Sequence, residues 1–353
     1  MNSISQPRWK VVEYSKNQII NAGKTIKKDN ASDEDVKQAL LVIDNWRSAH
    51  AFPLHIIYTH LRRFAKNNKD IIVSERLKRL DSILGKLKRE PTMSLWTMQD
   101  LGGCRFVVPN VGDVYTYVEK YEKSRKRHIL KNQYDYIKNP KKSGYRSVHM
   151  VYQYKSDRIE TYNRNMLIEI QFRTHLQHIW ATAVETMGLF TKEAIKSGQG
   201  SDDVKRFFAL ISSVFALREG QNTVPETDSN LDALLAEIQT LDDTHQYLSF
   251  LSGINVAIDK QKTYKGKYLN SYYLLILNYN TRMLSIKQYK ASDFEKANTV
   301  YNEIEQQRAE ANIDAVLVRS NSFDTLRSAY PNYFSDLTEF LDIVKSYLRK
   351  EQK

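Results

Sequence analysis

The chain has 353 residues, 41% of them hydrophobic and 27% charged, and a formal net charge of +12. This length predicts two domains, or one large domain with an appendage, and the composition excludes a low-complexity chain. No apolar run reaches the roughly 18 residues of a membrane span and the first residues lack a signal-peptide core, so we expect a cytoplasmic protein that does not bind membranes. Cys104 is the only cysteine, which excludes an internal disulfide and a multi-cysteine zinc site.

Helical and strand patterns alternate over the first two thirds of the chain. The elements predicted from apolar spacing and β-branched content are helices at 34–67 and 70–90, a strand at 104–108, a helix at 111–124, strands at 147–155 and 165–173, and helices at 175–190, 203–219 and 230–252. The first helix is expected to break near Pro53. Trp180 lies on the apolar stripe of its helix and is therefore predicted to be a core residue.

The pattern changes after Lys260, where shorter elements follow one another. The predicted elements there are strands at 271–280 and 282–290, a helix at 292–312, a strand at 313–320 and an amphipathic helix at 337–348. We therefore predict an α/β (α+β) domain over residues 1–225, a helical connector over 226–260, and a small ββαβ domain with a terminal helix over 261–353.

The strand at 165–173 separates two kinds of side chain. A period of two places Ile168 and Phe172 on one face, and Glu169, Gln171 and Arg173 on the other. The first face is predicted to join the core, and the second to carry chemistry.

Positive charge is concentrated between residues 119 and 146, which hold ten lysines and arginines against three acidic residues. Tyr134, Tyr136 and Tyr145 are interleaved with these charges. Basic side chains neutralise phosphates and tyrosine rings stack on bases, so the mixture suits a nucleotide or an RNA end. A solvated basic face is the ordinary alternative, and this segment alone does not decide between them.

Three short segments carry the chemistry: "DLGGCR" with Asp100 and Arg105, "SGYRSVHM", and "EIQFR" with Glu169 and Arg173. If their strands share a sheet, Asp100 and Glu169 can form a carboxylate pair suited to Mg²⁺, which prefers oxygen ligands and takes the others from substrate phosphates. Arg105, Arg173 and nearby lysines would then surround those phosphates.

Each residue also has an ordinary interpretation when it is taken singly. Asp100 fits a turn cap, Glu169 fits a pair with a lysine, and His149 fits a buried core histidine. The eight histidines show no metal-ligand spacing with a nearby acid and no His-Asp dipeptide, so a zinc site or metal-dependent hydrolase module is not expected.

Four motifs of the sequence resemble those of a known family. "RLKRLDSILGK", "DLGGCRFVV", "SGYRSVHMVY" and "IEIQFRTHLQHIWA" are similar to the successive motifs of RelA/SpoT-type alarmone synthetase domains, over roughly residues 50–190. The resemblance implies a five-stranded mixed sheet with flanking helices, related to nucleotidyltransferases. It also implies transfer of the β,γ-pyrophosphate of ATP, with Mg²⁺, to a ribose 3′-hydroxyl.

The resemblance also implies roles for individual residues. Asp100 would bind Mg²⁺, Glu169 would be a metal ligand or the base that activates the acceptor hydroxyl, and Tyr145 would stack on the acceptor base. The residues implied around ATP are Arg76 and Arg105 at the adenine, Lys78 and Lys86 at the phosphates, and Gln171, Arg173 and His149 in the surrounding shell.

The acceptor is GDP or GTP in ordinary alarmone synthetases, whereas a toxic branch modifies the 3′ end of tRNA and blocks translation. A compact nucleotide does not require so much positive charge, so we predict the tRNA acceptor end. The residues predicted to bind it are Arg125, Lys126, Arg127, Lys131, Lys141, Lys142 and Arg146.

The C-terminal segment resembles the restraining domain of CapRel-type fused toxin–antitoxin proteins, which defend bacteria against phage. That domain is like a zinc finger without its metal, and it carries a Tyr-x-x-Tyr motif over the ATP site. Here "YPNY" supplies Tyr330 and Tyr333. The resemblance implies autoinhibition by these rings and release by a phage major capsid protein.

We therefore predict an autoinhibited tRNA pyrophosphokinase toxin that is a monomer. Two alternatives stay open: a (p)ppGpp synthetase with a regulatory tail, and a catalytically inactive RNA-binding sensor.

Overall fold

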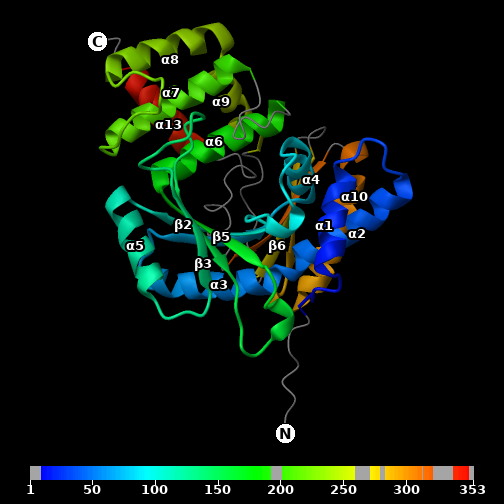
Figure 1. Ribbon diagram of the computed structural model, residues 1–353. Coiled ribbons are helices and arrows are strands. Elements are labelled where there is room, and N and C mark those ends of the chain that lie inside the picture. Colours follow the sequence, from blue (N-terminus) through cyan, green and yellow to red (C-terminus); the bar gives the residue numbers. More distant parts are fainter. Residues whose placement is uncertain are drawn as a thin grey trace.

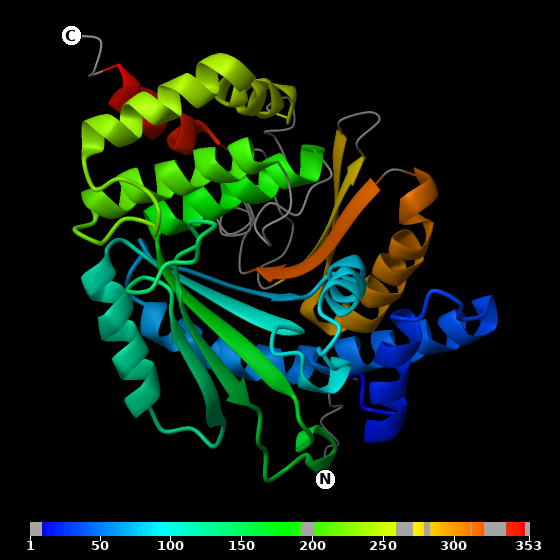
Figure 2. The same cartoon turned by 45° about the horizontal axis from the view of Figure 1, so that its top comes forward.

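A computed structural model describes residues 9–191, 201–258, 271–278, 283–311, 313–320 and 337–349. Within these ranges, eight strands form one mixed sheet in the order β3-β4-β5-β2-β1-β8-β6-β7 (Figures 1 and 2). The strands are β1 (Ile72–Leu77), β2 (Gly102–Val108), β3 (Ile129–Asp135), β4 (Val148–Gln153), β5 (Leu167–Thr174), β6 (Ser271–Asn278), β7 (Met283–Tyr289) and β8 (Ile313–Ser320). β2 and β5 run parallel, and the other neighbours in the sheet are antiparallel.

Helices surround this sheet (Figure 2). Their bounds are α1 (Lys16–Ile26), α2 (Asp33–Ala49), α3 (Ala51–Ala65), α4 (Leu80–Arg89), α5 (Val111–Lys123), α6 (His175–Thr191), α7 (Asp202–Arg218), α8 (Leu231–His245), α9 (Tyr247–Ile258), α10 (Phe294–Ala311) and α13 (Thr338–Leu348). The fold is therefore a mixed α+β fold, as expected. None of the described helices is both long and apolar enough to cross a membrane.

Most predicted elements are confirmed, and the largest error is at 70–90. This range was expected to be one helix, but the structure has β1 at Ile72–Leu77 and a helix only from Leu80. The strand forms because β1 pairs with β2 on one side and with β8 on the other, a long-range context that local spacing does not show. The helix expected at 230–252 is interrupted at Gln246, whose φ of 59° lies in the left-handed region and ends α8.

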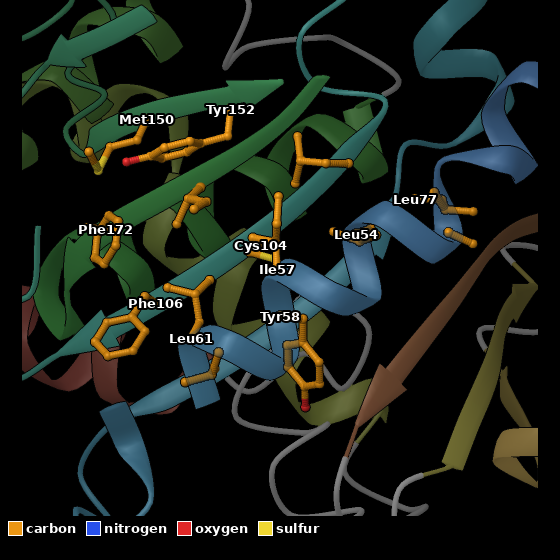
Figure 3. Packing of buried hydrophobic residues seen from close by; sticks show 14 of the residues in the cluster. Leu54, Ile57, Tyr58, Leu61, Leu77, Cys104, Phe106, Met150, Tyr152 and Phe172 are labelled. Carbon is orange, nitrogen blue, oxygen red and sulfur yellow. The ribbon is translucent and has the colours of Figure 1, made fainter. Parts of the chain in front are cut away.

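The main core lies between α3, α5 and one face of the sheet (Figure 3). Leu54, Ile57 and Leu61 of α3 belong to the same buried cluster as Phe106 of β2 and Phe172 of β5. Ile168 and Ile170 join the same cluster, which confirms the apolar face predicted for β5. The opposite face of these strands carries the polar side chains of Arg105, Glu169, Gln171 and Arg173.

A second cluster unites α6, α7, α8 and α13. Trp180 is 2% exposed and its indole N–H donates to the Phe208 carbonyl at 2.8 Å, which confirms it as a core residue. Phe340 of α13 packs on Phe208 and Phe215, so the terminal helix closes this cluster.

The C-terminal strands extend the first sheet. The chain order β6, β7, α10, β8 matches the expected ββαβ pattern, and β8 pairs with β1 through Glu75–Arg319 and Arg76–Val318. The domain limits at residues 225 and 260, and the likeness to a metal-free zinc finger, stay predictions.

His50, at the junction of α2 and α3, makes stability depend on pH. Its ring is fully buried and its Nδ1–H donates to the Trp46 carbonyl at 2.7 Å. Burial lowers the pKa of His50 from 6.5 to about 4, although the hydrogen bond to Trp46 opposes this. Between pH 4 and pH 6.5, His50 is therefore protonated in the unfolded chain but neutral in the folded chain. Because the unfolded chain binds the additional proton, the free energy of unfolding falls by roughly 3 kcal/mol as pH falls from 6.5 to 4.

We expect His50→Leu to flatten the decline of the unfolding free energy over this range, measured by urea denaturation at several pH values. His175, whose side chain is 41% exposed, supplies the control His175→Leu, which should keep the decline of the unsubstituted protein. Parallel pH profiles for His50→Leu and the unsubstituted protein would contradict the assignment.

Candidate active site

The polar face of the sheet brings the predicted residues together. Gly103 pairs with Glu169 across the parallel β2 and β5, while Gln171 pairs with Arg105 on one side and with His149 on the other. Directly paired residues project to the same face of a sheet, so strands far apart in sequence place these side chains in one row.

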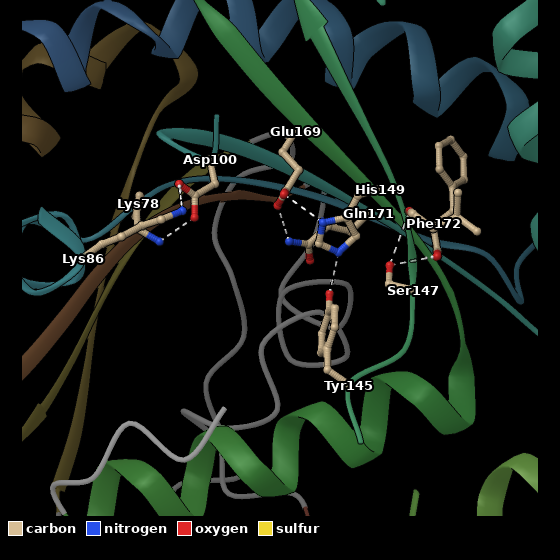
Figure 4. A network of polar contacts seen from close by, with 10 residues as sticks. Lys78, Lys86, Asp100, Tyr145, Ser147, His149, Glu169, Gln171 and Phe172 are labelled. Carbon is tan, nitrogen blue, oxygen red and sulfur yellow. Dashed lines mark hydrogen bonds and ion pairs between the residues drawn. The ribbon is translucent and has the colours of Figure 1, made fainter. Parts of the chain in front are cut away.

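Glu169 lies at the centre of this row. Its Oε1 accepts a hydrogen bond from His149 Nδ1 at 2.8 Å, its Oε2 accepts one from Gln171 Nε2 at 2.6 Å, and the Tyr145 hydroxyl lies 2.8 Å from His149 Nε2 (Figure 4). Burial favours the neutral acid, but His149 and Gln171 outweigh it and hold the pKa of Glu169 below its ordinary value. The carboxylate is therefore ionised at neutral pH and fixed in direction.

Asp100, just before β2, is held by two lysines. Lys78 Nζ donates to its Oδ2 at 2.8 Å and Lys86 Nζ to its Oδ1 at 3.3 Å (Figure 4). Burial again favours the neutral acid, but the two ammonium groups outweigh it and hold the pKa of Asp100 far below its ordinary value. Lys78 directly follows β1 and Lys86 lies in α4, so the predicted phosphate ligands do converge on the predicted metal ligand.

The two carboxylates lie close enough to influence each other, because the charge of Asp100 raises the pKa of Glu169. Figure 4 shows them next to each other, between the lysines and His149. No cluster of three or more His, Cys, Asp or Glu side chains able to hold a metal occurs among the residues that the structure describes. Two carboxylates fit Mg²⁺ if substrate phosphates and water complete its shell.

Three arginines form a positive cluster beside the carboxylates. Arg173 is 1% exposed, one of its Nη2–H groups meets His178 Nδ1, and its Nε and Nη1 have no hydrogen-bond partner in the described part of the chain. Burial, with the charges of Arg105 and Arg76, lowers the pKa of Arg173 to about 10. Buried guanidinium groups with unused N–H donors are a site for an anion.

Sequence reasoning missed the side chains of α6 that face this cluster. Glu185 Oε1 lies 3.6 Å from Arg105 Nη2, and His178 accepts from Arg173. His178, Thr182 and Glu185 recur at helical spacing, so a polar stripe in an otherwise apolar helix was the available signal.

Tyr145 is almost fully buried, with 4% of its surface exposed, and burial raises its pKa to about 12. Tyr136 meets the rings of both Tyr145 and His149 edge-on, and Tyr134 stacks on Tyr136 with an interplanar angle of 4°. Lys141 Nζ lies 4.4 Å from the centre of the Tyr136 ring. An aromatic row thus leads from Glu169 to Tyr134, which is 37% exposed.

The predicted tRNA-binding residues divide into two groups. The exposed ones are Arg125, Arg127, Lys131, Lys141 and Lys142. Arg146 is 3% exposed and donates to the carbonyls of Ile137 and Asn222, so it ties loops together instead of facing solvent. Lys126 Nζ is directed to backbone carbonyls at the end of α5, including that of Glu122 at 2.7 Å. Tyr330 and Tyr333 lie outside the described residues.

Comparisons with known proteins show what the chain is similar to. Residues 75–192 match the family described as "Region found in RelA / SpoT proteins". GTP pyrophosphokinase YjbM of Bacillus subtilis (strain 168) is 38% identical over 112 residues, which are 31% of this chain and 52% of YjbM. GTP pyrophosphokinase YwaC of the same organism is 29% identical over 157 residues, which are 42% of this chain and 72% of YwaC. The chain thus spans about half the length of YjbM.

Among solved structures, the small alarmone synthetase 1 of Bacillus subtilis bound to its product pppGpp aligns with 53% of this chain and 94% of its own, at 29% identity and a TM-score of 0.42. Residues 75–192 are therefore similar to the region found in RelA/SpoT proteins. This range contains Asp100, Tyr145, His149 and Glu169.

Proposed function

We propose that the protein is an ATP-dependent pyrophosphokinase. The observation that carries the proposal is the placement of two ionised carboxylates, Asp100 and Glu169, between two lysines and a buried guanidinium cluster. Phosphoryl-transfer sites need this combination, because positioned cations stabilise the charge on the phosphates while a carboxylate accepts the proton of the attacking hydroxyl.

ATP would enter between α4 and the positive cluster. Lys78 and Lys86 would turn from Asp100 to the phosphates, Arg173 would offer its unused N–H groups, and Arg76 and Arg105 would flank the adenine. Mg²⁺, held by Asp100 and Glu169, would withdraw charge from the phosphate oxygens. Gln171 and His149 would keep Glu169 oriented.

The reaction moves the β,γ-pyrophosphate as one unit. The acceptor 3′-oxygen forms a bond to the β-phosphorus, the bond between that phosphorus and the α,β-bridging oxygen breaks, and AMP leaves with that oxygen. Glu169 takes the proton of the 3′-hydroxyl, which the ionised state of its carboxylate permits. The resemblance gives Tyr145 the role of stacking on the acceptor base, but its ring is only 4% exposed. Tyr134, which is 37% exposed, is therefore the ring of the aromatic row that an incoming base would meet first.

The acceptor we propose is the 3′ end of tRNA, which would make the protein a translation-inhibiting toxin. The aromatic row from Tyr145 through Tyr136 to Tyr134 suits the stacking of bases, and the exposed Arg125, Lys131 and Lys142 suit a phosphate backbone. A second candidate is (p)ppGpp synthesis from GDP or GTP, favoured by the names of both curated relatives, which are GTP pyrophosphokinases.

The regulation we propose follows the resemblance of the C-terminal segment. Tyr330 and Tyr333 would cover the adenine side of the ATP site, and a phage major capsid protein would release them, in a cytoplasmic and monomeric protein. Support comes from β8, which hydrogen-bonds β1 at Arg76, so the C-terminal strands reach the ATP side of the sheet.

One incubation tests both proposals. The unsubstituted protein and the double variant Tyr330→Ala, Tyr333→Ala are each given γ-labelled ATP, Mg²⁺, and either bulk tRNA or GDP and GTP. We expect label in tRNA, with a rate in the double variant at least about tenfold higher because the rings no longer exclude ATP. Label only in GDP or GTP would favour (p)ppGpp synthesis. Equal rates for the unsubstituted protein and the double variant would contradict autoinhibition. The absence of label from every acceptor would favour a catalytically inactive RNA-binding sensor.

A further inference from the structure

A polar seam joins α10 of the C-terminal segment to α2. Asn302 Nδ2 donates to Asp44 Oδ2 at 2.8 Å, and Asn298 Nδ2 donates to Ser48 Oγ at 3.1 Å. Ser48 Oγ in turn donates to Asp44 Oδ1 at 3.2 Å. Figure 1 shows α10 beside α2, although about 250 residues separate them in the chain. Directional hydrogen bonds of this kind fix the position of α10 along α2.

Arg47 lies in the middle of this seam and is 1% exposed. Its guanidinium carbon lies 4.5 Å from the centre of the Tyr301 ring of α10, and Tyr301 is itself fully buried. The Asp44 carboxylate lies 3.7 Å from Arg47 Nη1. A buried guanidinium needs such compensation, and the ring face supplies part of it through a desolvated cation–π contact.

The other side of Arg47 reaches the candidate active site. Arg47 Nε donates to the backbone carbonyl of Lys78 at 2.7 Å, while the backbone N–H of Lys78 donates to the Leu101 carbonyl at 2.8 Å. Lys78 is therefore held at both backbone groups, and its ammonium reaches Asp100 at 2.8 Å. Any shift of Arg47 changes one of the two backbone contacts that aim this lysine.

We propose that Tyr301 positions Lys78 through Arg47, so that α10 is a working part of the ATP site. Tyr301 and Arg47 are then positioning residues, and the C-terminal segment is needed for ATP binding as well as for the proposed restraint. The role of Lys78 toward phosphate rests on the proposed function. The mechanical link from Tyr301 to Lys78 does not.

Hydrogen exchange of the full-length protein tests the link itself. In Tyr301→Leu, peptides that contain Lys78 should exchange at least about fivefold faster, because the face of the ring that holds Arg47 is lost. Tyr301→Phe keeps the ring face and should exchange like the unsubstituted protein. Phe340→Leu, a buried aromatic of α13 that packs on Phe208 and Phe215, should leave these peptides unchanged.

Kinetics then test the consequence, in the Tyr330→Ala, Tyr333→Ala background. Tyr301→Leu should raise KM for ATP about tenfold and leave KM for the acceptor unchanged. A fall in kcat with an unchanged KM for ATP would indicate only a smaller folded fraction and would overturn the proposal, as would equal exchange in Tyr301→Leu and Tyr301→Phe. If none of the variants transfers pyrophosphate, the proposed function is wrong. The hydrogen-exchange result still decides whether Tyr301 positions Lys78 through Arg47.

Discussion

Glu169→Gln is expected to lower the rate of pyrophosphate transfer by about a thousandfold, because a neutral amide cannot take the proton of the acceptor hydroxyl. The substitution keeps the size of the side chain, and the remaining oxygen can still accept from His149. The rate is measured with γ-labelled ATP in the Tyr330→Ala, Tyr333→Ala background, and the loss should be in kcat, since Glu169 acts on the reacting atoms.

Glu219 supplies the matched control. It is also a partly buried glutamate, and its Oε2 accepts from Gln177 Nε2 at 3.0 Å, but it lies at the end of α7 outside the site. Glu219→Gln should keep a rate within about threefold of its parent, as substitutions outside the reacting centre do. A Glu169→Gln rate within tenfold of the parent, with an unchanged unfolding transition, would show that Glu169 is not the base.

Local pattern predicted the parts of the site that depend on one strand. The period of two in β5 correctly separated Glu169 and Gln171 from the core residues Ile168 and Ile170. It could do so because alternation is a property of a single strand. The bonds of Glu169 to Gln171 and of His149 to Tyr145 follow from that alternation and from the short spacing within "SGYRSVHM".

Features that depend on distant segments were not predicted. Ile83, Leu84 and Leu87 of α4 give the whole range 70–90 a helical spacing, so the sequence predicts a helix where β1 forms. Its strand partner Arg319 lies more than 200 residues away, where sequence spacing carries no information. A tertiary partner therefore overrode the local preference.

The number of basic residues in a segment does not predict which of them face solvent, for a related reason. Arg146 and Lys126 belong to the most basic segment of the chain, yet their N–H groups donate hydrogen bonds to backbone carbonyls. The sequence shows that a basic side chain is present, but only the fold shows whether its N–H groups donate to backbone carbonyls or face solvent. The proposed contact with tRNA is therefore best tested at exposed basic side chains such as Lys131.

Gly144→Ala is expected to destabilise the fold by about 3 kcal/mol or more, since strain and crowding add. Gly144 has a φ of +86°, and a Cβ there would lie 2.8 Å from Ser212 Cβ, 2.9 Å from Trp180 Cζ2 and 3.2 Å from Ala209 Cα. The last atom belongs to the backbone of α7 and cannot turn aside. Because the loop that carries Gly144 also carries Tyr145, the same substitution should weaken binding of the proposed acceptor.

Gly220→Ala separates the cost of the left-handed backbone from the cost of crowding around the new Cβ. The φ of Gly220 is +66°, but a Cβ there would meet no atom within 4 Å. Gly220→Ala therefore carries the cost of the left-handed backbone alone, about 1 kcal/mol. Urea denaturation of both variants measures the difference, and equal losses would show that the contacts of Gly144 with α6 and α7 are looser than the structure has them. A larger loss at Gly144 would instead show that the loop carrying Gly144 and Tyr145 has its position because a glycine lets it lie directly on these two helices.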